Sequence, residues 1–262
     1  MLTLNRLHFY KLNRSIMRQI FSFFIISLTT INVSKAQNMA QYPDAVTPII
    51  LSSNSAYNQD FNVMKPTPVK GLSNQLPEGW AFTETGSSAN TTFRLGNGIS
   101  ASPDTYAFGL TQGNPDKAIG SFLGGGNFST SSYGALFTNG TSKEIKSLEI
   151  TYYGEHWRSG VSSSRSSGPD SLVFSYSLDA KSLNDGEWIR VKNLDFTSIS
   201  NPGISSKDNV MNGNEDANRK KITATISVNI PKGAKFWIKW DDINIDGADD
   251  GLGVDDFSII AK

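Results

Sequence analysis

The sequence contains no cysteine, so disulfide bonds are excluded and the fold must depend on its hydrophobic core. Of the two histidines, only His156 lies outside the first 36 residues. A Ser-His-Asp or Cys-His catalytic arrangement would have to use this one residue, and no histidine pair offers a zinc site. No Gly-x-Ser-x-Gly sequence is present, and the glycine run at 124–126 lacks the following lysine and helix of a phosphate-binding loop.

Acidic residues are absent from the first 36 positions, which contain five Lys or Arg residues. Arg18 precedes an apolar run at 20–28, and small residues precede a predicted cleavage after Ala36. This pattern predicts a secretory signal peptide over residues 1–36. The apolar run is short for a membrane span, although a retained N-terminal anchor is the alternative. Met17 is an alternative start, because it gives a more compact signal.

Basic runs are also missing from the rest of the chain. The protein has 24 basic and 24 acidic residues, and removal of the five basic residues of the signal leaves 19 against 24, a net charge of −5. A mildly acidic surface argues against a nucleic acid as the main partner. The mature protein is expected to be secreted, periplasmic or extracellular, with no membrane span.

Short strand-like segments separated by Gly, Ser, Asn and Asp make up the chain after about residue 55. Residues 222–230 alternate strictly between apolar and polar side chains, which predicts a half-buried strand. No helical periodicity extends beyond two turns, although 214–221 could form one short turn. Further strands are predicted at 148–152, 172–178, 188–191, 235–240 and 252–259.

This spacing predicts an all-β fold, an antiparallel β-sandwich of the jelly-roll-like kind. The length after the signal suits one large β domain better than two small ones. We therefore expect a single sandwich domain at 56–262, preceded at 37–55 by a leader or a first edge strand.

Seven carboxylates lie within the 16 residues from 241 to 256, and such density requires water, a cation or basic partners. The spacing at 242–247 matches the opening of a calcium loop, but Gly253 stands where an EF-hand has its bidentate Glu. Either a solvated turn or a calcium-supported turn is consistent with this pattern. The candidate calcium ligands are Asp242, Asn244, Asp246, Asp249, Asp250 and Asp256.

The last predicted strand, at 252–259, places the neighbouring carboxylates Asp255 and Asp256 on opposite faces. In a regular strand, Val254 and Asp256 would share one face, while Asp255 and Phe257 would share the other. One carboxylate of the pair is then expected to point into the core, where it needs a hydrogen bond, a basic partner or a metal.

A second informative stretch begins after the strand at 148–152. Glu155, Trp157 and Arg158 could hydrogen-bond to and stack on a sugar, or form an internal Glu–Arg pair capped by the indole. We take these three residues as the candidate ligand-binding site. Catalytic carboxylates would have to come from Glu84, Glu149 and Glu155, whose separation in space the sequence does not give.

Five tryptophans are many for a small β domain. Trp237 and Trp240 are three residues apart on one predicted strand, so they should point to opposite faces. One of them is expected to lie outward or at a sheet edge, where an exposed indole could serve as a sugar platform.

Five segments together resemble a secreted bacterial module that occurs alone, beside extracellular endonuclease domains, or before sorting tails in surface proteins. They are 76–80, 154–158, 217–219, 236–240 and 249–257. The resemblance covers about residues 56–260 and implies a jelly-roll-like sandwich with an accessory or binding role. The ending of the last strand, aliphatic-Asp-Asp-aromatic, also resembles jelly-roll modules that bind carbohydrate or mediate adhesion.

The expected function is that of a secreted, non-enzymatic binding module for carbohydrate or a cell-surface polymer, with calcium as a candidate stabilising ion. Two alternatives remain open. One is a secreted hydrolase, a glycoside hydrolase or a nuclease-associated enzyme, that uses carboxylates. The other is an adhesion or structural protein without a small ligand.

Overall fold

The computed structural model describes residues 39–43, 45–64, 72–73, 75–110, 116–124, 127–160, 169–199, 210–246 and 248–262. The predicted signal peptide at 1–36 lies outside these residues, as does its alternative start at Met17. The predicted leader at 37–55 contains β1 (Met39–Tyr42) and β2 (Ile49–Leu51).

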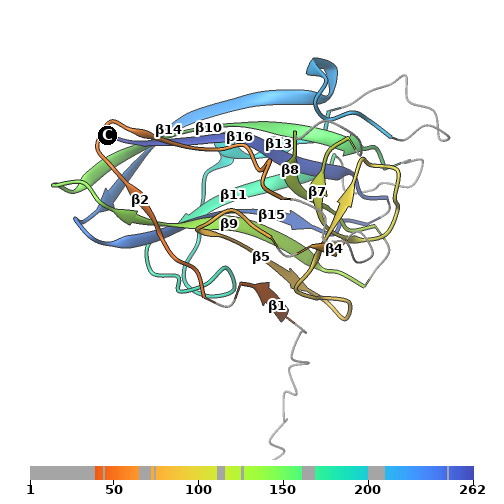
Figure 1. Ribbon diagram of the computed structural model, residues 1–262, viewed down its shortest axis with the longest axis horizontal. Coiled ribbons are helices and arrows are strands. Elements are labelled where there is room, and N and C mark those ends of the chain that lie inside the picture. The colour runs from red at the N-terminus through yellow and green to blue at the C-terminus, as the bar shows by residue number, and fades with distance from the viewer. Residues whose placement is uncertain are drawn as a thin grey trace, which may run out of the picture. The chain divides into compact units, whose positions relative to one another are not determined.

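Two sheets pack face to face and form the two layers seen in Figure 1. Sheet 1 consists of β1, β2, β5 (Trp80–Thr85), β9 (Thr130–Asn139), β11 (Ser171–Ser177), β12 (Ile189–Arg190), β13 (Phe196–Thr197) and β15 (Lys235–Ile243). Sheet 2 consists of β3 (Ala56–Gln59), β4 (Leu72–Ser73), β6 (Phe93–Gly96), β7 (Asp104–Phe108), β8 (Ala118–Phe122), β10 (Ile145–Arg158), β14 (Arg219–Ile230) and β16 (Gly251–Ala261). Two short 3-10 turns are Lys192–Leu194 and Asp216–Asn218.

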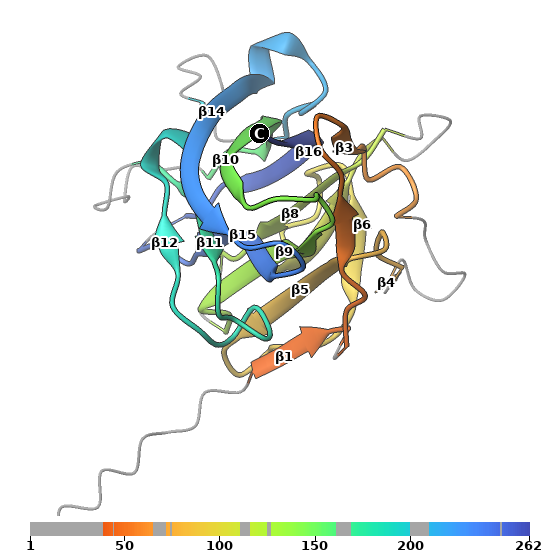
Figure 2. The ribbon, with the colours of Figure 1, turned by 90° about the vertical axis from the view of Figure 1, so that its left-hand side faces the viewer.

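The predicted all-β, jelly-roll-like sandwich is confirmed. The last three strands alternate between the layers, with β14 and β16 in sheet 2 and β15 in sheet 1. Among the described residues, the named strands of both sheets pair antiparallel, apart from β2 with β9 and β6 with β7, which are parallel. Figure 2 shows β1 lying along β5 at one edge of sheet 1. No helix in the described part of the chain is long and apolar enough to cross a membrane.

The core between the sheets is built around aromatic side chains from both layers. Trp80 and Trp240 of sheet 1 lie parallel with ring centroids 6.2 Å apart, and Phe257 of sheet 2 meets both rings edge-on at 5.5 and 5.6 Å. Offset and edge-to-face arrangements are the favoured geometries of aromatic pairs. All three side chains are at most 1% exposed, so this contact joins the two sheets.

Trp237 and Trp240 do point to opposite faces, and one of them lies outward as expected, but that residue is not an exposed sugar platform. Trp240 enters the core, whereas Trp237 lies on the outer face of sheet 1 and is only 1% exposed. There it packs with Leu136 and with Leu183, which belongs to the connection between β11 and β12. That connection covers the outward indole, so neither tryptophan offers a platform to solvent.

A β-bulge on β16 corrects the expected placement of the Asp pair. Asp256 has φ +48°, and two residues of β16 lie opposite Tyr152 alone on β10. The extra residue shifts the alternation by one, so that Val254 and Phe257 both enter the core. Neither carboxylate therefore points between the sheets: Asp255 is buried on the outer side of sheet 2, and Asp256 is exposed.

The left-handed backbone at Asp256 gives a prediction. Asn tolerates this conformation, whereas a β-branched residue does not. Asp256→Val should lower the free energy of unfolding by about 1–3 kcal/mol, and Asp256→Asn should leave it within about 0.5 kcal/mol of wild type. Urea denaturation of the three proteins measures both values, and equal stability of the two variants would contradict the role of the bulge.

Candidate functional site

A pocket of about 350 Å³ lies on the outer face of sheet 1. Alternation along β15 directs Lys239 and Asp241 outward while Trp240 and Asp242 point inward. The remaining lining residues come from β1, β5, β9, the end of β15 and the β11–β12 connection. They are Met39, Thr85, Thr130, Ser132, Leu183, Asn184, Asp185, Gly186, Trp188 and Ile243.

Hydrogen bonds and an ion pair hold the polar groups of this pocket in place. Lys239 Nζ lies 3.0 Å from Asp241 Oδ1, and Ser132 Oγ donates to the same oxygen at 2.5 Å. Thr83 Oγ1 donates to Asn184 Oδ1 at 2.8 Å. An ammonium, a carboxylate, an amide and a hydroxyl are therefore presented together, largely on strands.

Trp188 supplies the aromatic surface of the pocket. The other four tryptophans are at most 1% exposed, whereas Trp188 is partly exposed. Its Nε1 donates to the carbonyl oxygen of Asp185 at 2.7 Å, and Lys239 Nζ lies 4.3 Å from its ring centroid. The side chain also packs against the cluster around Trp237, so its orientation is constrained from several sides.

Sequence patterns did not single out Trp188. The strand predicted at 188–191 is only Ile189–Arg190 in the structure, which leaves Trp188 in the connection before it. The signal that the sequence offered was a tryptophan directly after the turn-like polar stretch 184–187, where an aromatic side chain can meet solvent.

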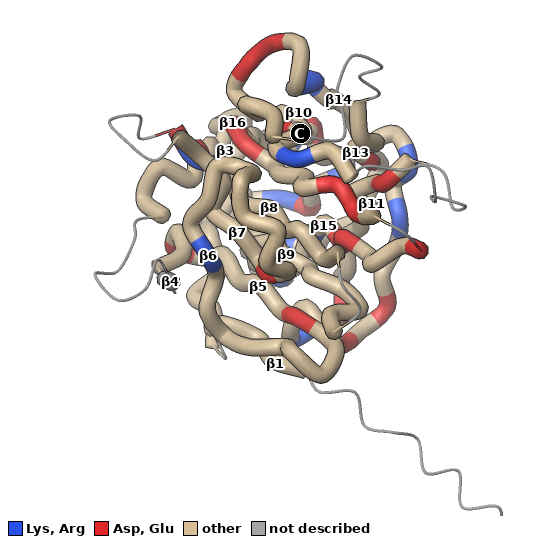
Figure 3. Tube along the Cα trace, turned by 90° about the vertical axis from the view of Figure 1, so that its right-hand side faces the viewer, with Lys and Arg blue, Asp and Glu red and all other residues tan. Residues whose placement is uncertain are grey.

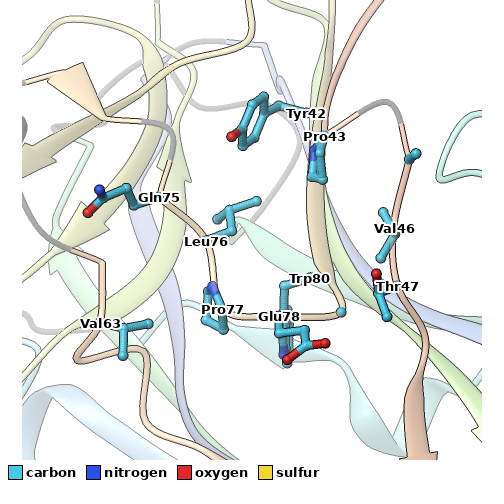
Figure 4. A pocket seen from close by; sticks show the side chains of 12 residues that line it. Tyr42, Pro43, Val46, Thr47, Val63, Gln75, Leu76, Pro77, Glu78 and Trp80 are labelled. Atoms are coloured by element: carbon cyan, nitrogen blue, oxygen red, sulfur yellow. The ribbon is translucent and has the colours of Figure 1, made fainter.

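A larger hollow of about 510 Å³ lies between residues 42–47 and 75–80 (Figure 4). In Figure 4, Tyr42 and Pro43 lie across the hollow from Gln75 and Leu76. Half of its lining residues are aliphatic, and Trp80 at its edge is 1% exposed and donates from Nε1 to Tyr57 OH at 3.0 Å. Because Trp80 is buried, this hollow presents no open indole face, unlike the Trp188 pocket.

The structure places the predicted Glu155, Trp157 and Arg158 at the end of β10, without an open indole face. Trp157 is fully buried, stacks on Phe108 at 5.7 Å and donates from Nε1 to Glu155 Oε2 at 2.9 Å. A Cβ on Gly213 would come within 2.3 Å of the same indole nitrogen. The predicted stacking surface is thus occupied by protein, which favours the structural interpretation.

The internal contacts of Glu155 and Arg158 differ from the ion pair that the sequence suggested. The expected Glu155–Arg158 pair is not the contact formed, because Glu155 bonds to the indole instead. Arg158 donates to the carbonyl oxygens of Gly98 and Ile99 at 2.8 and 3.2 Å, and its guanidinium lies 5.3 Å from the Phe122 ring centroid.

Three of the six predicted calcium ligands gather at one end of the sandwich. Asp242, Asp249 and Asp250 are buried, together with Asp170, which no sequence pattern indicated. Asp242 Oδ2 accepts a hydrogen bond from Ser121 Oγ at 2.5 Å, while its Oδ1 has no partner in the described structure. Burial, and then the charges of Asp170, Asp249 and Asp250, raise the pKa of Asp242 well above its usual range.

The other three predicted ligands lie elsewhere or bond otherwise. Asn244 donates to the Phe128 carbonyl oxygen at 2.7 Å, Asp246 is exposed, and Asp256 belongs to the bulge. Within the described ranges, no three Asp, Glu or His side chains converge closely enough to hold a metal between them. An ion at Asp242 would therefore need further oxygens from backbone or water.

The three carboxylates that the hydrolase alternative would have to use do not form a shared site. Glu84 is buried between the sheets, Glu149 is paired with Lys262 near the surface, and Glu155 is buried on the outer side of sheet 2. His156 is buried as well, with its ring nitrogens 3.2 and 2.9 Å from the carbonyl oxygens of Ile199 and Arg158. These contacts fit structural roles.

Glu84 and Asp104 form a buried carboxyl pair between the sheets. Glu84 Oε1 accepts from the backbone and hydroxyl of Thr105 at 3.0 and 2.7 Å, and Asn90 donates to Oε2 at 3.0 Å. Asp104 Oδ2 lies 2.7 Å from Arg94 Nε. Burial, followed by the charge of Glu84, raises the pKa of Asp104 to about 7, although Arg94 opposes this shift.

No protein-family model matches the sequence, and no curated protein matches it. Solved structures share parts of the fold at low similarity. TmCBM61 in complex with β-1,4-galactotriose is 11% identical over 58% of this chain and 74% of its own, with a TM-score of 0.30. The K3 cleaved adhesin domain of Lys-gingipain from Porphyromonas gingivalis w83 is 12% identical over 63% of this chain and 95% of its own, with a TM-score of 0.36.

The enzymatically active domain of tailspike protein 4 from bacteriophage CBA120 is also similar, at 7% identity and a TM-score of 0.36. The match covers 70% of this chain but only 19% of the tailspike chain.

The Asp104 carboxyl gives a pH prediction. Its folded pKa of about 7 exceeds the unfolded value of about 4, so its stabilising contribution is present below pH 4 and is lost as pH rises through 7. In urea denaturation between pH 4 and 8, Asp104→Asn should lose less stability with rising pH than wild type, by a few kcal/mol. Parallel pH profiles of the two proteins would contradict this assignment.

Calcium at the Asp242 cluster stays a prediction. A ligand that binds only the folded state stabilises it by about 2.7 kcal/mol at a hundredfold excess over its Kd, which corresponds to several degrees in Tm. Millimolar calcium should therefore raise the Tm and EDTA should reverse it, and Asp242→Asn should remove the contribution of this cluster. A Tm of Asp242→Asn that responds to calcium as wild type does would exclude an ion there.

Proposed function

We propose that this protein is a secreted, non-enzymatic binding module whose ligand is a carbohydrate or a cell-surface polymer, bound at the Trp188 pocket. The observation that carries the proposal is Trp188 itself. It is the one tryptophan of five that solvent reaches, and it lies beside fixed hydrogen-bonding groups.

The chemistry of the pocket matches that of a sugar ring. A pyranose offers C–H groups that pack on an aromatic side chain, and hydroxyls that both donate and accept hydrogen bonds. Trp188 supplies the apolar contact, Lys239 donates, and Asp241 accepts. Ser132 and Thr130 add hydroxyls from β9, so the polar groups are held on strands, where side-chain positions are better defined than on loops.

A binding role fits the rest of the molecule better than hydrolysis. The buried Glu84–Asp104 pair lies between the sheets, where a polymer has no access, and Glu149 is engaged by Lys262. Retaining and inverting glycosidases need two carboxyl groups on either side of an accessible scissile bond. Secretion is supported by the N-terminal signal pattern in the sequence.

Substitution of Trp188 tests the site. In a panel of soluble plant, algal and bacterial polysaccharides, the wild-type protein should bind at least one by isothermal titration calorimetry. Trp188→Ala should weaken that binding about tenfold or more, because tryptophans that a ligand covers contribute a large share of the binding free energy. Its Tm should stay close to wild type, since the side chain is partly exposed.

Trp157→Ala is the matched control. Removing this fully buried indole should cost about 3–5 kcal/mol of unfolding free energy, measured with urea. The folded fraction of this variant should still bind the polysaccharide. Unchanged binding by Trp188→Ala, or no binding of wild type to any member of the panel, would count against the proposal.

A further inference from the structure

A second group of carboxylates lies on the outer side of sheet 2, away from the Asp242 cluster. Tyr153 of β10 pairs with Asp255 of β16, and Glu155 lies two residues farther along β10 on the same face. The inward side chains of these strands, Tyr152 and Val254, belong to the core, so this face is the outer one. Figure 3 marks the acidic segment of β16 in red.

Two oxygen atoms in this group are buried without a partner. Glu155 is 1% exposed and Asp255 is 2% exposed, and neither Glu155 Oε1 nor Asp255 Oδ1 has a hydrogen-bond partner among the described residues. An ionised carboxylate left in this state costs several kcal/mol unless it is protonated, paired or bound to a metal. Both side chains come from central strands, which fix their positions.

Burial and neighbouring negative charges raise the pKa values of both carboxyl groups. Burial, followed by the charge of Glu155, raises the pKa of Asp255 to about 9. Burial raises the pKa of Glu155 to about 7, against the hydrogen bond from Trp157, and Asp116 and Asp256 add repulsion. With these pKa values Asp255 is protonated and Glu155 is about half protonated at neutral pH, unless a cation takes the place of the protons.

One cation, Arg219, lowers the pKa of Glu155 through its charge, but it forms its ion pair with another residue. Arg219 lies opposite Glu155 in the strand register. Its guanidinium is 4.7 Å from the Tyr153 ring centroid, and it forms its ion pair with Asp216 at 3.0 Å. No ion pair between described residues reaches Glu155 or Asp255.

We propose that Glu155 Oε1 and Asp255 Oδ1 bind a hard divalent cation, calcium or magnesium. Carboxylate oxygens without sulfur or imidazole select these ions. Because no third Asp, Glu or His side chain converges on the pair, water and backbone oxygens complete the coordination. Binding through two carboxylates with retained water is a common mode for magnesium, and calcium accepts six to eight oxygens in less regular geometry.

A hollow lies beside the bulge of β16, next to the residue that follows Asp255. It has a volume of about 380 Å³ and is lined by residues 58–60 and by Asp256 and Phe257. The bulge directs Asp256 toward this solvent-filled side instead of the core. The same bulge therefore removes Asp255 from the hydrophobic core and places an accessible carboxylate next to it.

Metal titration of the purified full chain, after EDTA treatment and desalting, tests the site. Calorimetry with calcium chloride and with magnesium chloride should detect binding of at least one of the two ions. The double variant Glu155→Gln, Asp255→Asn should bind that ion at least tenfold more weakly, while Asp242→Asn should retain it. These isosteric changes remove charge but little volume, so the fold should persist, as checked by near-ultraviolet circular dichroism.

Terbium(III) luminescence supplies a second readout that reports position. The Trp157 indole touches Glu155, so terbium at this site should be sensitised by excitation at the tryptophan band. Trp157→Phe should lower that emission severalfold, and the double variant should abolish the same component. If the double variant does not fold, Asp255→Asn alone replaces it and should show the same loss of emission.

Two results would overturn the proposal. One is the absence of calcium and magnesium binding by wild type at neutral pH, which would leave the carboxyl pair neutralised by protons. The other is an ion whose affinity falls in Asp242→Asn but not in the double variant, which would place the metal at the Asp242 cluster. Neither result bears on polysaccharide binding at Trp188, which is measured separately.

Discussion

Asp256 adds one residue to the last strand, and the placement of the side chains around it depends on that addition. Without it, Val254 and Phe257 would point to opposite faces, and the contact of Phe257 with Trp80 and Trp240 could not form beside Val254. With it, the apolar residues on both sides of the bulge enter the core. Asp255 is directed to the outer side of sheet 2, and the carboxylate of Asp256 reaches solvent.

Buried carboxylates are the second common theme of the molecule. Glu84 with Asp104, Asp242 with its neighbours, and Glu155 with Asp255 are three separate groups in which burial raises a carboxyl pKa. Each group solves the same problem in a different way. Hydrogen bonds and Arg94 serve the first, and Ser121 and backbone amides serve the second apart from Asp242 Oδ1. The third keeps two oxygens without a partner among the described residues.

The outer faces of the two sheets differ in chemistry because different connections cover them. On sheet 1, the β11–β12 connection buries Trp237 and leaves Trp188 at the rim of a polar pocket. On sheet 2, aromatic side chains around Trp157 form a small second core. The indole of Trp157 is thus enclosed by protein on one sheet, whereas that of Trp188 is partly exposed on the other.

The sandwich follows from the sequence alone, since strict alternation at 222–230, the strand-like residues at 235–240 and the turn residues between strands are local signals that the structure confirms. The sequence also identified the acidic segment, of which Asp242, Asp249 and Asp250 do gather. Only the tertiary structure decided which aromatic side chain meets solvent, because coverage of Trp157 and Trp237 comes from segments distant along the chain. The bulge at Asp256 was equally beyond a periodic pattern, because an inserted residue is favoured only once core packing rewards the shifted register.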